Sequence, residues 1–214
     1  MGQKADVPYR LDDMANDAVG LLDALCIERA HIAGASMGGS IAQIVAGHYP
    51  NRTRSLISIM STTGRPELAT GERETIKVLL EPPPPVTDRE ALIRHGMRVR
   101  RAIGSPGYPQ SDDELRAIVT RSIDRKYDPD GSSRQYIATI ASGHRVELLQ
   151  KLKVPTLVLH GEADPLLPQE HGRDTAWITP GAQIDVYPGW GHDLPPGMIP
   201  ILVDRIATFC KAQT

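Results

Sequence analysis

The chain has 214 residues, of which 40% are hydrophobic and 4% aromatic, and its formal net charge is −2 at pH 7. A chain of this length can bury about 70% of its unfolded surface in a single domain, and the lack of a basic patch argues against a nucleic-acid partner. No run of apolar residues is long enough for a membrane-spanning helix, so a membrane partner is not expected either.

Two cysteines lie near opposite ends of the chain, Cys26 after an apolar helical pattern and Cys210 in the last helical pattern. Both are expected to be buried thiols rather than halves of a disulfide, which favours a reducing, cytoplasmic location. The opening residues Met1–Ala5 carry no apolar signal segment, in agreement with that location.

The first predicted element is a helix that Asp12 or Asp13 caps. We expect its buried stripe to consist of the apolar residues Met14, Ala18, Leu21, Leu22 and Leu25. Residues 31–35 then form a short apolar run typical of a strand, and residues 40–46 form a helix that Pro50 ends. Residues 55–60 supply the next strand.

From about Arg65 to Arg145 the pattern changes, because only helical pieces broken by proline and glycine are visible. The motif Thr87-Asp88-Arg89-Glu90 predicts a capping box that opens a helix to about Ile103. A similar motif beginning at Ser111 opens a second helix, and a third is expected near 134–141. We interpret residues 65–145 as a helical cap inserted into a core formed by residues 1–64 and 146–214.

Strands return in the last third of the chain, at residues 154–161 and 183–187. Strands that alternate with helices imply a parallel sheet with right-handed crossovers. The expected fold class is therefore α/β, with a mostly parallel sheet, flanking helices and the helical insertion.

The segment Gly34-Ala35-Ser36-Met37-Gly38 has the form Gly-x-Ser-x-Gly and lies between a predicted strand and a predicted helix. In that setting the serine hydroxyl projects from a tight turn, and the flanking glycines let the backbone pass close by without a clashing Cβ. This pattern predicts a nucleophile elbow with Ser36 as the nucleophile. The alternative is a glycine-rich turn with an idle serine.

A nucleophilic serine needs a base and a group that orients the base. Asp164 follows the strand at 154–161 and can face the active-site edge of a parallel sheet, although Glu162 is an alternative acid and Asp164 could instead start a turn. His192 lies on a glycine-flanked loop after the last strand, where we expect it to be free to swing over Ser36. The spacing of the remaining histidines does not favour a metal site.

Taken together, these motifs resemble the α/β-hydrolases of the esterase, lactonase and haloperoxidase-like branch, and more narrowly the aclacinomycin methylesterase-like hydrolases. The resemblance rests on Leu11–Ala15, Gly34–Gly39, Ser61–Gly64, Gly104–Pro109, His160–Leu166 and Gly191–Pro196. It implies a partial α/β-hydrolase fold, a triad of Ser36, His192 and Asp164, and a backbone oxyanion donor at Met37, with no cofactor.

The resemblance also implies a difference, because such relatives carry about eighty further residues before Tyr9, including the loop that supplies a second oxyanion donor. Loss of one donor costs about 3–4 kcal/mol of transition-state stabilisation. The strand before Ser36 would also become an unpaired edge. We therefore expect self-association into a homo-oligomer through residues 29–33.

The sequence thus predicts a serine hydrolase that cleaves small-molecule carboxylic esters through an acyl-enzyme intermediate. A lactonase or cofactor-free perhydrolase with the same triad is an alternative within enzymes. The alternative of another class is an inactive hydrolase fragment that lacks a complete oxyanion hole.

Overall fold

The computed structural model describes residues 7–213, and the Met1–Ala5 segment considered above lies outside them. Four strands form one parallel sheet in the order β1-β2-β3-β4. Their bounds are β1 (Ala30–Ala35), β2 (Thr53–Ile59), β3 (Thr156–Gly161) and β4 (Gln183–Tyr187). The predicted α/β class and all four predicted strands are confirmed, with end points that differ by at most two residues.

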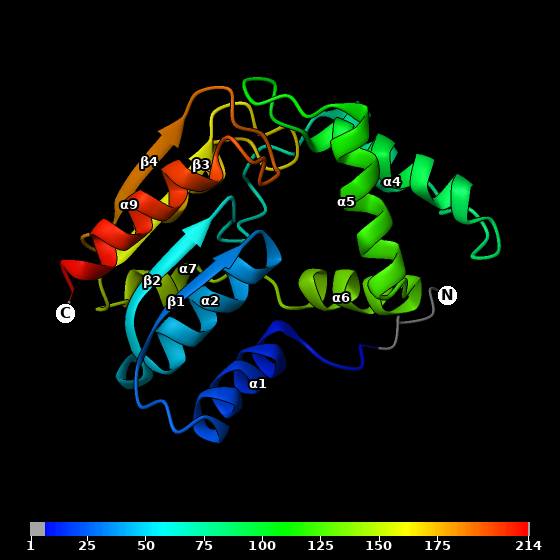
Figure 1. The fold of residues 1–214 in the computed structure, drawn as a ribbon. Coiled ribbons are helices and arrows are strands. Elements are labelled where there is room, and N and C mark those ends of the chain that lie inside the picture. Colours follow the sequence, from blue (N-terminus) through cyan, green and yellow to red (C-terminus); the bar gives the residue numbers. More distant parts are fainter. Residues whose placement is uncertain (1–6, 214) are drawn as a thin grey trace.

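Helices connect these strands and cover the sheet (Figure 1). They are α1 (Leu11–Ala24), α2 (Met37–His48), α3 (Arg73–Leu79), α4 (Arg89–Ile103), α5 (Asp112–Arg125), α6 (Pro129–Ala141), α7 (Val146–Gln150), α8 (Glu170–Ile178) and α9 (Ile199–Lys211), with a short 3₁₀ turn, η1 (Pro50–Arg52), before β2. In the described chain, no helix has the length and apolarity needed to cross a membrane.

The core is divided between the two faces of the sheet, because successive strand residues point to opposite sides. On one face Ile57 and Ile59 of β2 pack with Leu202 and Phe209 of α9. On the other face Leu56 packs with residues of α2 and with the segment that follows α7. Since β2 is covered on both faces, every residue of the strand except Arg54 is buried, as expected for a central parallel strand.

Residues 65–145 contain the four helices α3 to α6 and no strand, as the sequence predicts. Figure 1 shows α4 and α5 standing apart from the sheet. The two helices bury a small core of their own, which consists of Ile93, Met97, Leu115 and Val119. This core is distinct from the two hydrophobic cores that cover the faces of the sheet.

The structure corrects the sequence analysis at α1. Leu11, Ala15 and Val19 form the buried face, which packs against α2, whereas Leu21 and Leu25 are each 59% exposed. Of the predicted stripe, Met14 packs against this cluster, but the rest of the stripe was wrong. Apolar residues lie on two sides of this helix, and only contact with α2 decides which side is buried. The N-cap is Arg10 rather than Asp12 or Asp13, although the Asp13 carboxylate accepts from the Arg10 N–H at 2.7 Å.

The cysteine prediction is also only partly correct. Both thiols are free, but Cys26 is exposed rather than buried, since it follows the end of α1 in a turn with a φ of +54°. Cys210 is half-buried on α9.

The helix caps of residues 65–145 agree only in part with those predicted from local sequence. The capping box from Ser111 to Glu114 is present as predicted. The box predicted from Thr87 is wrong, because the Asp88 side chain accepts from the Ala91 N–H at 2.9 Å and caps α4 instead. The helix expected near 134–141 begins earlier, at Pro129, where Asp128 caps it.

The cap of α4 leads to a first prediction. Replacement D88A leaves a helix N–H without its acceptor and should lower the free energy of unfolding by about 1 kcal/mol, whereas T87A should change it little. Urea denaturation followed by circular dichroism measures both variants. Equal destabilisation by the two changes would contradict the assignment of Asp88 as the cap.

Candidate active site

The turn between β1 and α2 places Ser36 at the carboxyl edge of the sheet. β1 ends at Ala35, α2 begins at Met37, and Ser36 between them has a φ of +53° and a ψ of −122°. A non-glycine residue in this region is strained, and such strain concentrates at functional sites. Two contacts from the region of β2 hold the turn: the Ser36 N–H donates to the Ile59 carbonyl at 2.9 Å, and the Ser61 hydroxyl donates to the Ser36 carbonyl at 2.8 Å.

The glycines around Ser36 do not contribute equally. A Cβ on Gly34 would lie 2.0 Å from the Gly38 carbonyl oxygen, and one on Gly39 would lie 2.5 Å from the Ser61 Cβ. A Cβ on Gly38 would meet nothing within 4 Å. The expectation that both flanking glycines avoid a clash therefore holds for Gly34 and is wrong for Gly38, while Gly39 is the second position that steric contact restricts.

Asp164 follows β3 and is 4% exposed. Its Oδ1 accepts from the N–H groups of Leu166 at 2.9 Å and Leu167 at 2.8 Å, so the turn that the sequence allowed as an alternative is also present. Its Oδ2 lies 2.7 Å from His192 Nδ1. Glu162, the alternative acid, is exposed.

His192 links the other two residues. Its Nδ1 is bonded to Asp164, and its Nε2 lies 2.9 Å from the Ser36 hydroxyl oxygen. An ionised carboxylate only accepts hydrogen bonds, so the proton on Nδ1 points to Asp164 and the lone pair on Nε2 points to the serine hydroxyl. The structure thus brings Ser36, His192 and Asp164 into one hydrogen-bonded row. In the chain, His192 lies 156 residues from Ser36 and 28 residues from Asp164.

The loop that carries His192 is anchored rather than free, which corrects the sequence expectation. His192 is 7% exposed, and its backbone N–H donates to the carbonyl of Ile103, the last residue of α4, at 2.8 Å. The Gly191 N–H donates to the Ser105 hydroxyl at 2.9 Å, and that hydroxyl also bonds to the Asp193 carboxylate. Burial raises the pKa of Asp193 above its usual range.

Sequence reasoning therefore missed the part that Ile103 and Ser105 play in holding the histidine loop. The segment Gly104–Pro109 was visible as part of the family resemblance, but nothing in its pattern indicated which loop it contacts. A Cβ on Gly191 would lie 2.4 Å from the Gly104 carbonyl oxygen, so the two segments touch through their backbones. That contact joins residues that are almost ninety positions apart.

Met37 is the first residue of α2, so helix geometry supplies no carbonyl for its N–H group. The positive end of the helix dipole lies at the same place, beside the Ser36 hydroxyl. An N–H group in this position is suited to bind a developing negative charge.

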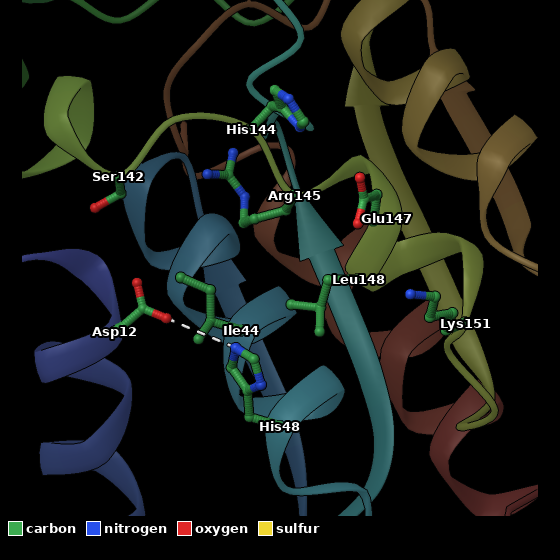
Figure 2. A pocket seen from close by; sticks show the side chains of 9 residues that line it. All are labelled: Asp12, Ile44, His48, Ser142, His144, Arg145, Glu147, Leu148 and Lys151. Carbon is green, nitrogen blue, oxygen red and sulfur yellow. Dashed lines mark ion pairs between the residues drawn. The ribbon is translucent and has the colours of Figure 1, made fainter.

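A cavity of about 450 Å³ lies between α1, α2 and α7 (Figure 2). Arg145, the buried charged residue in its lining, donates to the Gln43 side chain at 2.9 Å and to the carbonyls of Gly143 at 3.0 Å and Thr62 at 2.9 Å. None of these acceptors is charged, and burial lowers the pKa of Arg145 to about 10. The lining does not include Ser36, and the cavity is separate from the row described above.

Within residues 7–213, no group of three or more histidine, cysteine, aspartate or glutamate side chains is placed to hold a metal ion.

Known proteins resemble this chain in sequence and in fold. A family model described as alpha/beta hydrolase fold matches residues 2–195. A rhodomycin D methylesterase from Streptomyces peucetius is 25% identical over 225 residues, which cover 97% of this chain and 75% of that protein. A poly(3-hydroxyalkanoate) depolymerase from Ectopseudomonas oleovorans is 30% identical over 182 residues, which cover 84% of this chain and 60% of that protein.

Among solved structures, an enol-lactonase from Burkholderia xenovorans LB400 matches with a TM-score of 0.74 and 21% identity, over 98% of this chain and 76% of that one. A meta-cleavage product hydrolase from Pseudomonas fluorescens IP01 matches with a TM-score of 0.74 and 19% identity, over 100% of this chain and 76% of that one. At this level of identity the likeness concerns the fold alone.

The steric contrast between two glycines gives a prediction for the elbow. Replacement G34A forces a Cβ into the Gly38 carbonyl and should lower the free energy of unfolding by about 1–3 kcal/mol. The matched change G38A places its methyl in open space within a helix and should be neutral or stabilising. Urea unfolding measures both, and a G38A variant that is less stable than G34A would contradict this account of the turn.

Proposed function

Because this chain belongs to the alpha/beta hydrolase fold family, we propose that it is a serine hydrolase of carboxylic esters in which Ser36, His192 and Asp164 act as a triad. The observation that carries the proposal is the row of two hydrogen bonds, 2.9 Å from Ser36 to His192 and 2.7 Å from His192 to Asp164. Relatives named as a methylesterase, a depolymerase and an enol-lactonase support the reaction class.

In the proposed reaction, the Ser36 hydroxyl attacks the ester carbonyl while His192 Nε2 takes its proton. His192 then gives that proton to the leaving alcohol, and a water molecule releases the acid from the acyl-enzyme by the same steps in reverse order. Asp164 holds the imidazole in the required tautomer and stabilises its protonated form. The Met37 N–H donates one hydrogen bond to the oxyanion.

We further propose that residues 65–145 form a cap on a core made of residues 1–64 and 146–214. The contact between the end of α4 and the histidine loop supports this division, since it places the helical segment beside the proposed reaction site. A cavity of about 340 Å³ between α3, α6 and the loop after Asp164 is lined by side chains that include Leu68, Ile76, Leu79, Leu166 and Leu167. Such a lining would suit an apolar part of a small-molecule ester.

A lactone is the second candidate substrate, since it is a cyclic ester and the same triad would open it. An enol-lactonase from Acinetobacter baylyi is 25% identical over 162 residues of the alignment, which supports the comparison of ester and lactone substrates. We propose a reducing cytoplasmic location, which the two free thiols support.

The triad assignment predicts the outcome of p-nitrophenyl acetate hydrolysis by four proteins. S36A should reduce turnover to the buffer background, and D164N should lower kcat by about 10⁴-fold because the imidazole loses its orienting partner. E162Q should retain wild-type turnover, since the Glu162 side chain is exposed.

Equal rates for the wild type and S36A would reject the proposal and favour an inactive hydrolase fold. A loss in E162Q with full activity in D164N would instead identify Glu162 as the acid.

We also propose that the chain self-associates through β1. This strand lies at the edge of the sheet order, and among the described residues only β2 pairs with it. Light scattering should give a mass above that of one chain, and A33K should lower it because a lysine on an edge strand opposes pairing. The control A117K alters an exposed position of α5. A wild type that is monomeric at all concentrations would contradict the proposal.

A further inference from the structure

His160 is a completely buried histidine of β3 for which the proposed reaction has no use. Its Nε2 lies 2.8 Å from the Leu167 carbonyl oxygen. Its Nδ1 has no hydrogen-bond partner among the described residues. Buried polar atoms are normally paired, so an unpaired one in a well-packed strand requires a physical reason.

The hydrogen bond fixes the state of the ring. A carbonyl oxygen only accepts, so the proton must be on Nε2, and Nδ1 is left as an unpaired acceptor. Burial lowers the pKa of His160, because desolvation disfavours the protonated ring. The ionisable groups that face the ring are Asp164, His192 and His171. His160 is therefore a neutral imidazole with one fixed N–H donor.

That donor acts on the turn that holds Asp164. His160 Nε2 binds the carbonyl of Leu167, and the N–H of the same residue binds Asp164 Oδ1 at 2.8 Å. The same Nε2 lies 3.6 Å from Asp164 Oδ2, the oxygen that bonds to His192. The Nε2–H group of His160 thus lies near the carboxylate oxygen that bonds to His192.

The backbone of α8 packs closely against one side of the ring. Gly172 of α8 packs against it so closely that a Cβ there would lie 2.6 Å from His160 Nδ1 and 2.8 Å from its Cγ. Any side chain at position 172 would therefore displace the imidazole. The glycine at position 172 and the unpaired Nδ1 of His160 therefore lie at the same contact between β3 and α8.

We propose that His160 is a positioning residue, whose Nε2–H fixes the turn at Leu167 and through it the orientation of the Asp164 carboxylate toward His192. This inference rests on the proposed function of Asp164. An apolar residue at 160 would avoid the unpaired nitrogen, but it would leave the Leu167 carbonyl without its donor.

The first test compares H160L, which removes the donor at similar size, with H160Q, whose side-chain amide can still reach the Leu167 carbonyl. With p-nitrophenyl acetate, H160L should lower kcat by about 10- to 100-fold, because small displacements of an orienting group have effects of this size. The change in KM should be smaller than the change in kcat, since Leu167 is one of many residues that line the proposed substrate cavity. H160Q should recover most of the lost kcat.

The second test does not depend on turnover. Proton NMR of the resting enzyme reports the low-field resonance of His192 Nδ1–H, which arises from its bond to Asp164. This resonance should broaden or move upfield in H160L and return in H160Q. If S36A shows that the chain is not an esterase, the NMR result still decides whether His160 orients Asp164.

The third test leaves His160 in the sequence and displaces its ring by adding a methyl group at position 172. G172A should reproduce the loss of kcat and the NMR change, whereas the control G20A adds a methyl to an exposed position of α1 with nothing within 4 Å and should change neither. The proposal is overturned if folded H160L or G172A keeps the wild-type kcat and His192 resonance. It is also overturned if H160Q and H160L are equally impaired.

Discussion

The buried carboxylate of Asp164 is the group on which the rest of the site depends. A charge removed from water costs several kcal/mol unless nearby donors compensate for it. Here two backbone N–H groups bind Oδ1 and the His192 ring binds Oδ2. Because these donors come from the loops after β3 and β4, the carboxylate fixes the position of one loop relative to the other. The position of the imidazole in front of Ser36 follows from that.

The parallel sheet brings the residues of this site together. The register pairs Ala35 with Ile59, Ile59 with Leu159 and Gly161 with Tyr187, so the carboxyl ends of the four strands meet at one edge. Ser36 follows β1 directly, and Asp164 lies three residues beyond β3. Residues far apart in sequence can therefore share a site although each is placed by its own strand.

The helical segment between β2 and β3 is tied to this edge at both of its ends. Arg145 joins the two ends, since its backbone N–H donates to the Thr63 carbonyl at 2.8 Å and its guanidinium to the Thr62 carbonyl at 2.9 Å. The end of α4 holds the histidine loop through Ile103. Movement of the helical segment would therefore displace His192. It would also displace the residues next to Ser61, whose hydroxyl binds the Ser36 carbonyl.

Much of the fold and of the candidate site is determined by local sequence. The strand-to-helix turn at Ser36, the four strands and the cap at Ser111 depend on residues within a few positions of one another, so their patterns are visible in the chain itself. Four other features do not follow from local sequence. They are the choice between Asp164 and Glu162, the buried face of α1, the anchoring of the His192 loop by Ile103, and the unpaired nitrogen of His160. Each depends on which distant segment packs against the residue. Only the tertiary structure decides such features, because the same side chain can be buried or exposed, paired or unpaired, according to a contact that local sequence does not encode.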